Sequence, residues 1–220
     1  MKIAIDGTAG SGKGTLSERL SKKLCIPYLD TGLLYRKVAY DYLTKFEFKS
    51  NFQLNKKNLM GLLNHSDFKD LNSTELKKDK YGLFASRLAK IPELRNRLNI
   101  LQIEFIDIML KKNGGCILDG RDIGTQIMPD AEFKFFIVAS VKSRTDRRFK
   151  ELQYDDLPKQ EQLIMYKELF NRIELRDNSD YNRKISPLKK AFDAFEIDTT
   201  KLTPQQVESI ALKHISKQII

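Results

Sequence analysis

The stretch from Gly7 to Thr15 combines residue types that together bind phosphate. Where a strand, a glycine-rich turn and a helix follow in this order, backbone N–H groups converge at the helix N-terminus and favour an anion. Glycines permit positive φ angles and the close approach of phosphate oxygens. A lysine here adds a mobile charge for the outer phosphates. We therefore predict a phosphate-binding loop rather than an ordinary turn, made of Gly7, Thr8, Ala9, Gly10, Ser11, Gly12, Lys13, Gly14 and Thr15.

One residue departs from the usual form of this loop. Gly7, Gly12 and Lys13 satisfy the pattern Gly-x-x-x-x-Gly-Lys. Gly14 stands where the pattern has serine or threonine, and the hydroxyl follows one place later, at Thr15. That hydroxyl is the usual Mg²⁺ ligand. The loop alone therefore predicts phosphate binding more strongly than metal binding, with Thr15 as its candidate metal ligand.

A second group of residues follows the apolar run Cys116-Ile117-Leu118, which is typical of a buried parallel strand. The run continues as Asp119-Gly120-Arg121-Asp122-Ile123-Gly124-Thr125. A carboxylate at the tip of a buried strand can hold a metal-bound water opposite the phosphate loop, and Asp119 is our candidate. Arg121 and Asp122 could form an ordinary local ion pair, but beside a phosphate loop we favour a binding site.

Arginines form the third group. Arg36 lies near the carboxyl edge of the second predicted strand, where open parallel sheets bind ligands. Arg144, Arg147 and Arg148 precede a second helix, and a polar cluster from Arg176 to Arg183 follows it. A helical hairpin bearing arginines suits a mobile lid that neutralises charge and excludes water during phosphoryl transfer. A basic, solvated helix pair is the alternative.

The elements that must position these residues follow from hydrophobic periodicity and turn signals. The predicted strands are Ile3–Ile5, Ile26–Leu29, Cys116–Leu118, Phe133–Ala139 and Ala194–Asp198. Helical spacing is found over Leu16–Leu24, Leu33–Tyr42, Leu83–Ile91, Leu94–Ile108, the two arms of the basic hairpin around Tyr154–Pro158, and a last helix that opens at Thr203 and Pro204. Alternating strands and helices of this kind predict an α/β fold with a parallel sheet.

Between residues 45 and 80 the periodicity is lost, and asparagines and lysines are frequent. We predict an inserted subdomain here, with one short helix over Leu59–Leu63 and a small strand pair within 68–76. His65 and His214 have no cysteine or histidine neighbour at metal-ligand spacing, so both are predicted to be surface residues.

Composition limits the class of protein. The chain has 220 residues, enough for one α/β domain with insertions, and only Cys25 and Cys116 as cysteines, which indicates a reducing compartment. No signal segment is predicted, and no apolar run approaches the roughly twenty residues of a membrane span. The net charge of +10 fits either nucleic acid or a small phosphorylated ligand. Because the lysines are scattered, we favour the small ligand and expect no nucleic-acid partner. The few cysteines and the lack of a signal or membrane segment favour a cytoplasmic protein with no membrane partner, and we expect a monomer.

Together these motifs resemble those of the bacterial cytidylate kinases, in the same order and at similar spacing over nearly the whole chain. The matching motifs are Gly7–Thr15, Tyr28-Leu29-Asp30-Thr31-Gly32 with Tyr35-Arg36, Asp119–Thr125, and Arg176, Asp180 and Arg183 before Ser186-Pro187-Leu188. The loop alone indicates only a nucleoside monophosphate (NMP) kinase or a relative, whereas Asp119–Thr125 is more specific. Gly14 also fits, since NMP kinases share it and hold Mg²⁺ largely through water.

The resemblance implies a P-loop NTPase-type α/β fold, with a parallel five-stranded sheet flanked by helices, a small NMP-binding insert and a helical lid. We expect a single kinase domain over 1–220, with its core at 1–44, 81–140 and 186–220, the insert at about 45–80 and the lid at about 141–185. The implied activity is phosphorylation of CMP and dCMP to CDP and dCDP by ATP, through direct in-line transfer with Mg²⁺, in pyrimidine nucleotide metabolism.

The resemblance also implies roles for individual residues. ATP is expected at Gly7–Thr15, and Mg²⁺ at Asp119 through water. The residues expected to be catalytic are Lys13, Arg121, Arg144, Arg148 and Arg176. Those expected to bind CMP or dCMP are Arg36, Arg121 and Arg183 at the phosphate, Thr31, Arg176 and Asp180 near the sugar, and Ser86, Arg95 and Asp122 at the base.

The base-reading assignment is chemically reasonable by itself. Asp122 would accept from the exocyclic amine of cytosine, and Arg95 would donate to N3 or O2. A site built around that amine rejects uracil, whose carbonyl would leave the carboxylate unpaired. Two alternatives stay open: an NMP kinase that prefers UMP, and a nucleic-acid-stimulated NTPase, which the net charge of +10 suggests.

Overall fold

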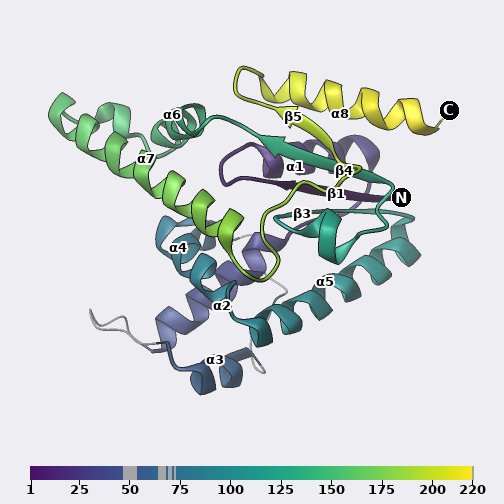
Figure 1. Cartoon of the computed structure of the whole chain (residues 1–220), viewed down its shortest axis with the longest axis horizontal. Helices are drawn as coiled ribbons and strands as arrows, with labels where there is room; N and C mark the ends of the chain where they lie inside the picture. Colours follow the sequence, from purple (N-terminus) through teal and green to yellow (C-terminus); the bar gives the residue numbers. More distant parts are fainter. Residues whose placement is uncertain (47–53, 64–67, 69–70, 72, 220) are drawn as a thin grey trace. The chain divides into compact units, whose positions relative to one another are not determined.

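The structure is a computed structural model that describes residues 1–46, 54–63, 68, 71 and 73–219 (Figure 1). Its contacts divide the chain into two compact units, Met1–Leu29 together with Ile106–Ile220, and Asp30–Phe105. The insert predicted at about 45–80 lies within the second unit, and the lid predicted at about 141–185 lies within the first. The boundaries of insert and lid stay predictions.

A parallel sheet is the centre of the first unit (Figure 1). Among the described residues it has five strands in the order β2-β3-β1-β4-β5. Their bounds are Lys2–Gly7 for β1, Tyr28–Asp30 for β2, Cys116–Gly120 for β3, Phe133–Val138 for β4 and Phe195–Asp198 for β5. The predicted α/β fold is confirmed, with the strand that leads into the phosphate loop in the middle of the sheet.

The core of this unit lies between the sheet and two helices, α1 (Lys13–Leu24) and α8 (Pro204–Ile219). Side chains two apart on a strand share a face, and side chains four apart on a helix share a stripe. The buried apolar side chains of both helices therefore meet those of one sheet face. They are Ile3, Ile5, Leu16, Leu20, Ile26, Ile117, Phe133, Phe135, Ile137, Ile197, Val207, Ala211 and Ile215.

The predicted basic hairpin consists of α6 (Val141–Glu151) and α7 (Lys159–Asn182), joined through a 3₁₀ turn at Tyr154–Asp156. Aromatic contacts hold its arms together: the ring of Phe149 lies edge-on to Tyr154 and to Tyr166, with centroids 5.5 Å apart in both pairs. The hydroxyl of Tyr166 donates to Asp146 at 2.6 Å, and burial is the first cause that raises the pKa of Tyr166 to about 12. The hairpin is therefore more than a pair of solvated basic helices.

Helix α7 is longer than its hydrophobic pattern predicts. The polar cluster that begins at Arg176 was expected after the helix, yet α7 continues to Asn182. Positions 176 and 180 are four apart, which places Arg176 and Asp180 on one side of the helix end, and Arg183 follows as the extended C-cap residue. The polar side chains here carry no apolar signal because they pair with charged residues of other elements, as Asp180 does with Arg121.

The second unit is helical in its described parts. It contains α2 (Thr31–Lys45), α3 (Lys56–Leu63), a 3₁₀ turn at Thr74–Lys77, α4 (Asp79–Leu88) and the part of α5 (Pro92–Asn113) that reaches Phe105. Helices α2 and α4 pack through aromatic rings, with Tyr42 and Phe84 centroids 5.8 Å apart and Tyr40 and Tyr81 centroids 5.3 Å apart. The short helix predicted over Leu59–Leu63 is confirmed as part of α3.

The strand pair predicted within 68–76 is not found in the described part of that range. Thr74–Lys77 forms a 3₁₀ turn, capped by the side chain of Ser73, which accepts from Glu75 N–H at 3.3 Å. The prediction failed because a serine cap outweighed weak strand propensity. Residues 69, 70 and 72, and His65, lie outside the described residues.

In the described part of the chain, no helix is long and apolar enough to span a membrane.

Candidate active site

The loop from Gly7 to Thr15 has the backbone geometry of a phosphate cradle. Gly7 ends β1 so close to β4 that a Cβ there would lie 2.1 Å from the carbonyl oxygen of Ile137. Gly12 caps α1 with a left-handed φ of 92°, which only glycine adopts without strain. The Ser11 hydroxyl donates to the Thr8 carbonyl at 2.9 Å and holds the turn closed. The N–H groups of α1 thus begin directly at the loop.

A cavity of about 370 Å³ lies over this loop, within the first unit. Its lining includes the polar side chains of Lys13, Arg147 and Glu151 and the apolar side chains of Leu202, Pro204 and Val207. Arg147 is fixed by Thr199: it donates to the Thr199 hydroxyl at 3.2 Å and also to the Thr199 carbonyl. The cavity therefore offers both anion-binding groups and an apolar wall. Its lining residues are Gly10, Ser11, Gly12, Lys13, Gly14, Thr15, Leu16, Arg147, Glu151, Thr199, Leu202, Pro204 and Val207.

Asp119 faces the loop from the end of β3. Its side chain is buried, and Oδ2 accepts from the hydroxyls of Tyr28 at 3.1 Å and Ser17 at 3.3 Å. A Cβ on Gly14 would lie 3.5 Å from Asp119 Oδ2 and 3.6 Å from the Tyr28 hydroxyl. The Asp119 carboxylate and the Tyr28 hydroxyl therefore lie beside the place where the serine or threonine side chain of the usual loop would begin.

The donor set around Asp119 fits a magnesium ion. Mg²⁺ prefers oxygen ligands and is commonly held by one or two carboxylates, waters and substrate phosphates. One buried carboxylate beside a phosphate loop meets that description, whereas Thr15 is exposed. No cluster of three or more histidine, cysteine, aspartate or glutamate side chains suited to a metal occurs within the described ranges. The residues thus fit an ion that is bound mostly by water and phosphate.

Asp6 joins the phosphate loop to the turn at 119–125. It lies on β1 just before Gly7, and its carboxylate accepts from Ile123 N–H at 2.9 Å and Gly124 N–H at 2.8 Å. Burial is the largest influence and raises the pKa of Asp6 to about 6, against the lowering effect of these two hydrogen bonds. Asp6 was not among the predicted site residues, although an acidic residue at a strand end directly before the loop was a usable signal.

Charged residues from the turn and from the end of α7 meet in the first unit. Arg121 donates to Asp180 at 2.7 Å, and Arg183 lies 3.7 Å from Asp122. Burial raises the pKa of Asp180, but Arg121, Arg176 and Arg183 together lower it below its usual range. Three arginines around two carboxylates leave an excess of positive charge. The structure thus brings together five residues predicted to bind CMP, from two separate sequence motifs.

Arg144 binds protein groups on three elements. Its guanidinium donates to both oxygens of Asp177 on α7, at 3.0 and 2.5 Å. It also donates to the carbonyls of Ala139, at 2.9 Å, and of Ala9 in the phosphate loop, at 3.0 Å. The other predicted lid arginine, Arg148, forms a 2.9 Å ion pair with Glu151. Of the arginines on α6, Arg147 lines the loop cavity, and its spacing three residues after Arg144 was the signal available in the sequence.

The remaining predicted residues belong to the second unit. Thr31 begins α2 and is buried, and Ser86 is half-buried on α4. Arg95 is buried, with its guanidinium 5.8 Å from the ring centre of Tyr35 and a 3.4 Å hydrogen bond to the Ala89 carbonyl. Arg36 donates through Nη1 to the carbonyls of Leu76 at 2.9 Å and Lys78 at 3.0 Å.

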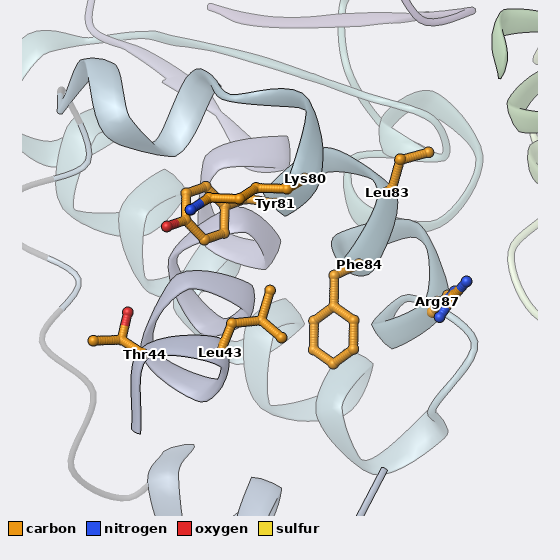
Figure 2. A pocket seen from close by; sticks show the side chains of 7 residues that line it. All are labelled: Leu43, Thr44, Lys80, Tyr81, Leu83, Phe84 and Arg87. Atoms are coloured by element: carbon orange, nitrogen blue, oxygen red, sulfur yellow. The ribbon is translucent and has the colours of Figure 1, made fainter. Parts of the chain in front are cut away.

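A second cavity, of about 460 Å³, lies between α2 and α4 in the second unit (Figure 2). Leu43, Leu83 and Phe84 give it an apolar lining, and Lys80 and Arg87 lie toward opposite ends in the view of Figure 2. Its lining includes none of the residues predicted to bind a nucleotide. We assign it no part in phosphate binding.

Comparisons with known proteins agree with this geometry. The cytidylate kinase family profile matches residues 3–217. A cytidylate kinase from Thermosipho melanesiensis is 39% identical over 223 residues, which cover 99% of this chain and 97% of that protein. One from Bartonella tribocorum is 41% identical over 214 residues, covering 97% and 93%. Among solved structures, shikimate kinase from Bacteroides thetaiotaomicron aligns with a TM-score of 0.50 at 12% identity, over 100% of this chain and 98% of that one, a likeness of fold alone.

Proposed function

This chain belongs to the cytidylate kinase family, and we propose on that basis how its residues transfer a phosphoryl group from ATP to CMP. The enzyme is an ATP-dependent kinase of CMP. A phosphate oxygen of CMP attacks the γ-phosphorus of ATP while the bond from that phosphorus to the β,γ-bridging oxygen breaks, which yields CDP and ADP. The monophosphate is already ionised, so no general base is required. We propose dCMP as a second acceptor.

ATP binds over the loop Gly7–Thr15 in this proposal. The N–H groups at the start of α1 hold the phosphates, and Lys13 neutralises charge on the transferred group. The apolar wall of the cavity, Leu202, Pro204 and Val207, suits a purine base. The cavity over a glycine-cradled loop is the single observation that carries the ATP assignment.

The ion that accompanies ATP is Mg²⁺, which neutralises phosphate charge when it is bound. Asp119 would hold it through water, and Tyr28 and Ser17 orient the carboxylate by their hydrogen bonds to Oδ2. Thr15 is the second candidate ligand. The fit of oxygen donors beside the loop supports this assignment.

The residues proposed to bind the acceptor are those that the family resemblance implies. We propose that Arg36, Arg121 and Arg183 clamp the monophosphate, that Thr31, Arg176 and Asp180 contact the sugar, and that Ser86, Arg95 and Asp122 read cytosine. Positive charge in excess around Asp180 supports the phosphate role, because a dianion restores balance there. Arg183 lies near Asp122, so one residue of the clamp adjoins one that reads the base.

Alignment of the two substrates and electrostatic stabilisation of the transition state provide most of the rate enhancement. We propose Lys13, Arg121, Arg148 and Arg176 as catalytic groups, and we add Arg147 because it lines the loop cavity. Arg144 was also predicted to be catalytic, and its bonds to Ala9 and Asp177 favour a positioning role instead. The hairpin of α6 and α7 is proposed to act as the lid.

The cell compartment and assembly state are proposals too. Cys25 and Cys116 are both free thiols, which fits the reducing cytoplasm. We propose a cytoplasmic monomer that acts on nucleotides and does not bind nucleic acid or membranes. No observation on the described residues favours an NMP kinase that prefers UMP or a nucleic-acid-stimulated NTPase.

Phosphorus NMR of the purified protein with ATP, CMP and Mg²⁺ tests the activity. We expect CDP and ADP to form in equal amounts, because one phosphoryl group moves per turnover. Lys13→Ala should lower kcat by about 100-fold, with little change in the thermal midpoint, because Lys13 stabilises charge that develops during transfer. Formation of free phosphate in place of CDP would contradict the proposal.

A further inference from the structure

Gly82, at the end of the first turn of α4, lies against the guanidinium of Arg36. A Cβ at this position would be 2.6 Å from Arg36 Nη2, 2.9 Å from Cζ and 3.1 Å from Nη1. Separations below 3.0 Å are not compatible with a real Cβ, so any side chain at 82 would require the guanidinium to move. The absence of a side chain therefore determines where Arg36 can lie.

The guanidinium is fixed on its other side by backbone. Nη1 donates to the carbonyls of Leu76 and Lys78, at 2.9 and 3.0 Å, and both residues come just before α4. These bonds set the orientation of the planar guanidinium. Because Gly82 has no side chain, the guanidinium plane can approach the helix backbone. We call this place of the Arg36 guanidinium, between the two carbonyls and Gly82, its seat. Position 86, four residues later, lies on the same side of the helix, and Ser86 is proposed to contact the base.

Local helix stability does not account for glycine here. A glycine inside a helix costs roughly 0.5–1 kcal/mol relative to alanine. Position 82 has ordinary helical hydrogen bonding, since Gly82 N–H donates to the Lys78 carbonyl at 3.4 Å, and its φ is not in the positive range. Alanine would suit the helix better, so the close approach of Arg36 is the feature that requires glycine.

The same unit offers a matched comparison. Gly61 also lies within a helix, α3, and a Cβ added there would meet nothing within 4 Å. The two glycines thus differ in one respect that matters, namely whether a cationic side chain occupies the space of the missing Cβ.

We propose that Gly82 is a positioning residue for the acceptor phosphate, which acts by giving Arg36 its seat against α4. This rests on the proposed role of Arg36 in the phosphate clamp. Alanine at 82 displaces the tip of a flexible side chain and not the backbone, so the fold tolerates the change. A clamp displaced by about 1 Å loses much of its effect, since phosphate binding depends on alignment.

The test compares Gly82→Ala, Gly61→Ala, Arg36→Ala and the double variant Gly82→Ala/Arg36→Ala. For each protein, KM for CMP, KM for ATP and the thermal midpoint are measured. We expect Gly82→Ala to raise KM for CMP by about 10-fold, to leave KM for ATP unchanged, and to keep or raise the thermal midpoint. Gly61→Ala should also keep or raise the midpoint, with both KM values unchanged.

The double variant decides whether Gly82 acts through Arg36. We expect it to have the same KM for CMP as Arg36→Ala alone, because the seat has no effect once the guanidinium is gone. A further rise in the double variant would overturn the inference. So would an unchanged KM for CMP in Gly82→Ala, or a thermal midpoint that falls by several degrees, which would mean that backbone had moved.

The same set separates this inference from the proposed function. If Arg36→Ala raises KM for CMP and Gly82→Ala does not, the seat is wrong and the clamp stands. If Arg36→Ala leaves KM for CMP unchanged, the role of Arg36 in the clamp is wrong, and the inference falls with it.

Discussion

The carboxyl group of Asp6 connects the phosphate loop to the turn that carries Arg121 and Asp122. Its two oxygens accept from two backbone N–H groups of that turn, those of Ile123 and Gly124, and these hydrogen bonds favour the ionised form. Burial opposes the charge and raises its pKa from 3.8 to about 6. The carboxyl group is thus ionised near neutral pH at a cost in stability. Its two hydrogen bonds fix the position of the turn at 119–125 relative to the phosphate loop.

This pKa makes stability depend on pH. The native state keeps the Asp6 proton up to about pH 6, whereas the unfolded chain releases it near pH 3.8. The native state therefore binds more protons between these values, and the free energy of unfolding falls as pH rises through that window. Protonation of Asp6 in the native state adds roughly 3 kcal/mol to the free energy of unfolding. This stabilisation is fully present below about pH 4 and is lost above about pH 6.

Urea unfolding of the wild type and of Asp6→Asn, at about pH 4, pH 5 and pH 7, measures this effect. The variant cannot ionise at position 6, so the difference in unfolding free energy between the two proteins should change across the window in favour of Asp6→Asn as pH rises. Other titrating groups are common to both proteins and cancel. A pH-independent difference would contradict the assigned pKa.

At the scale of residues, the sequence indicated which side chains belong to the candidate site better than it indicated which groups they contact. The loop glycines, Lys13 and Asp119 were identified because spacing along one strand and turn determines their neighbours. Asp6 was missed, and Arg147 was predicted only as a lid arginine and not at the loop cavity, because their partners, Gly124 and Thr199, are distant in sequence. No local pattern contains that information.

At the scale of elements, the Arg144–Asp177 pair links α6, α7 and the phosphate loop. Both oxygens of Asp177 are bound by the guanidinium, which also reaches the Ala9 carbonyl. Arg144 is 3% exposed and the Asp177 side chain 11%. Removal of one charge would leave the other buried without compensation, which is strongly destabilising.

We therefore expect Asp177→Asn to lower the free energy of unfolding by about 3 kcal/mol and to raise KM for ATP, because Arg144 no longer holds the loop. Lys142→Ala is the control, on α6 with Arg144: its ion pair with Asp146 is solvated, with side chains 76% and 42% exposed, and its loss should cost under about 1 kcal/mol. Urea unfolding and initial rates measure both effects. Equal losses of unfolding free energy in the two variants would show that the buried Arg144–Asp177 pair stabilises the protein no more than a solvated ion pair does.

Elements with strong periodicity were predicted well from the sequence. The strands that became β1, β3, β4 and β5 and the apolar faces of α1 and α8 follow from patterns of two and of three to four residues. The end of α7 was predicted too early, since polar residues from Arg176 onward carry no apolar signal. Asp180 and Arg183 contact Arg121 and Asp122, which are about sixty residues away in the sequence, so no local pattern contains these contacts.

For the whole molecule, the parallel sheet explains why residues far apart in sequence serve one reaction. β1 is flanked by β3 and β4, so the phosphate loop and Asp119 leave the sheet at neighbouring strand ends. The net charge of +10 then has a partial local explanation in the arginines of α6, α7 and the turn, several of which we propose to bind phosphates. The sequence predicted the sheet and these groups, but not how the second unit arranges Arg36 and Arg95.

The central claim is that this enzyme phosphorylates cytidine monophosphates, with Asp122 reading the base amine. Initial rates with ATP and each of CMP, dCMP, UMP, AMP and GMP, for the wild type and Asp122→Ala, test it most directly. We expect kcat/KM to be highest for CMP and dCMP in the wild type, and the ratio of CMP to UMP to fall by about 100-fold in the variant, because the unpaired carboxylate no longer rejects uracil. A wild type that prefers UMP or AMP, or a variant with an unchanged CMP to UMP ratio, would contradict the account.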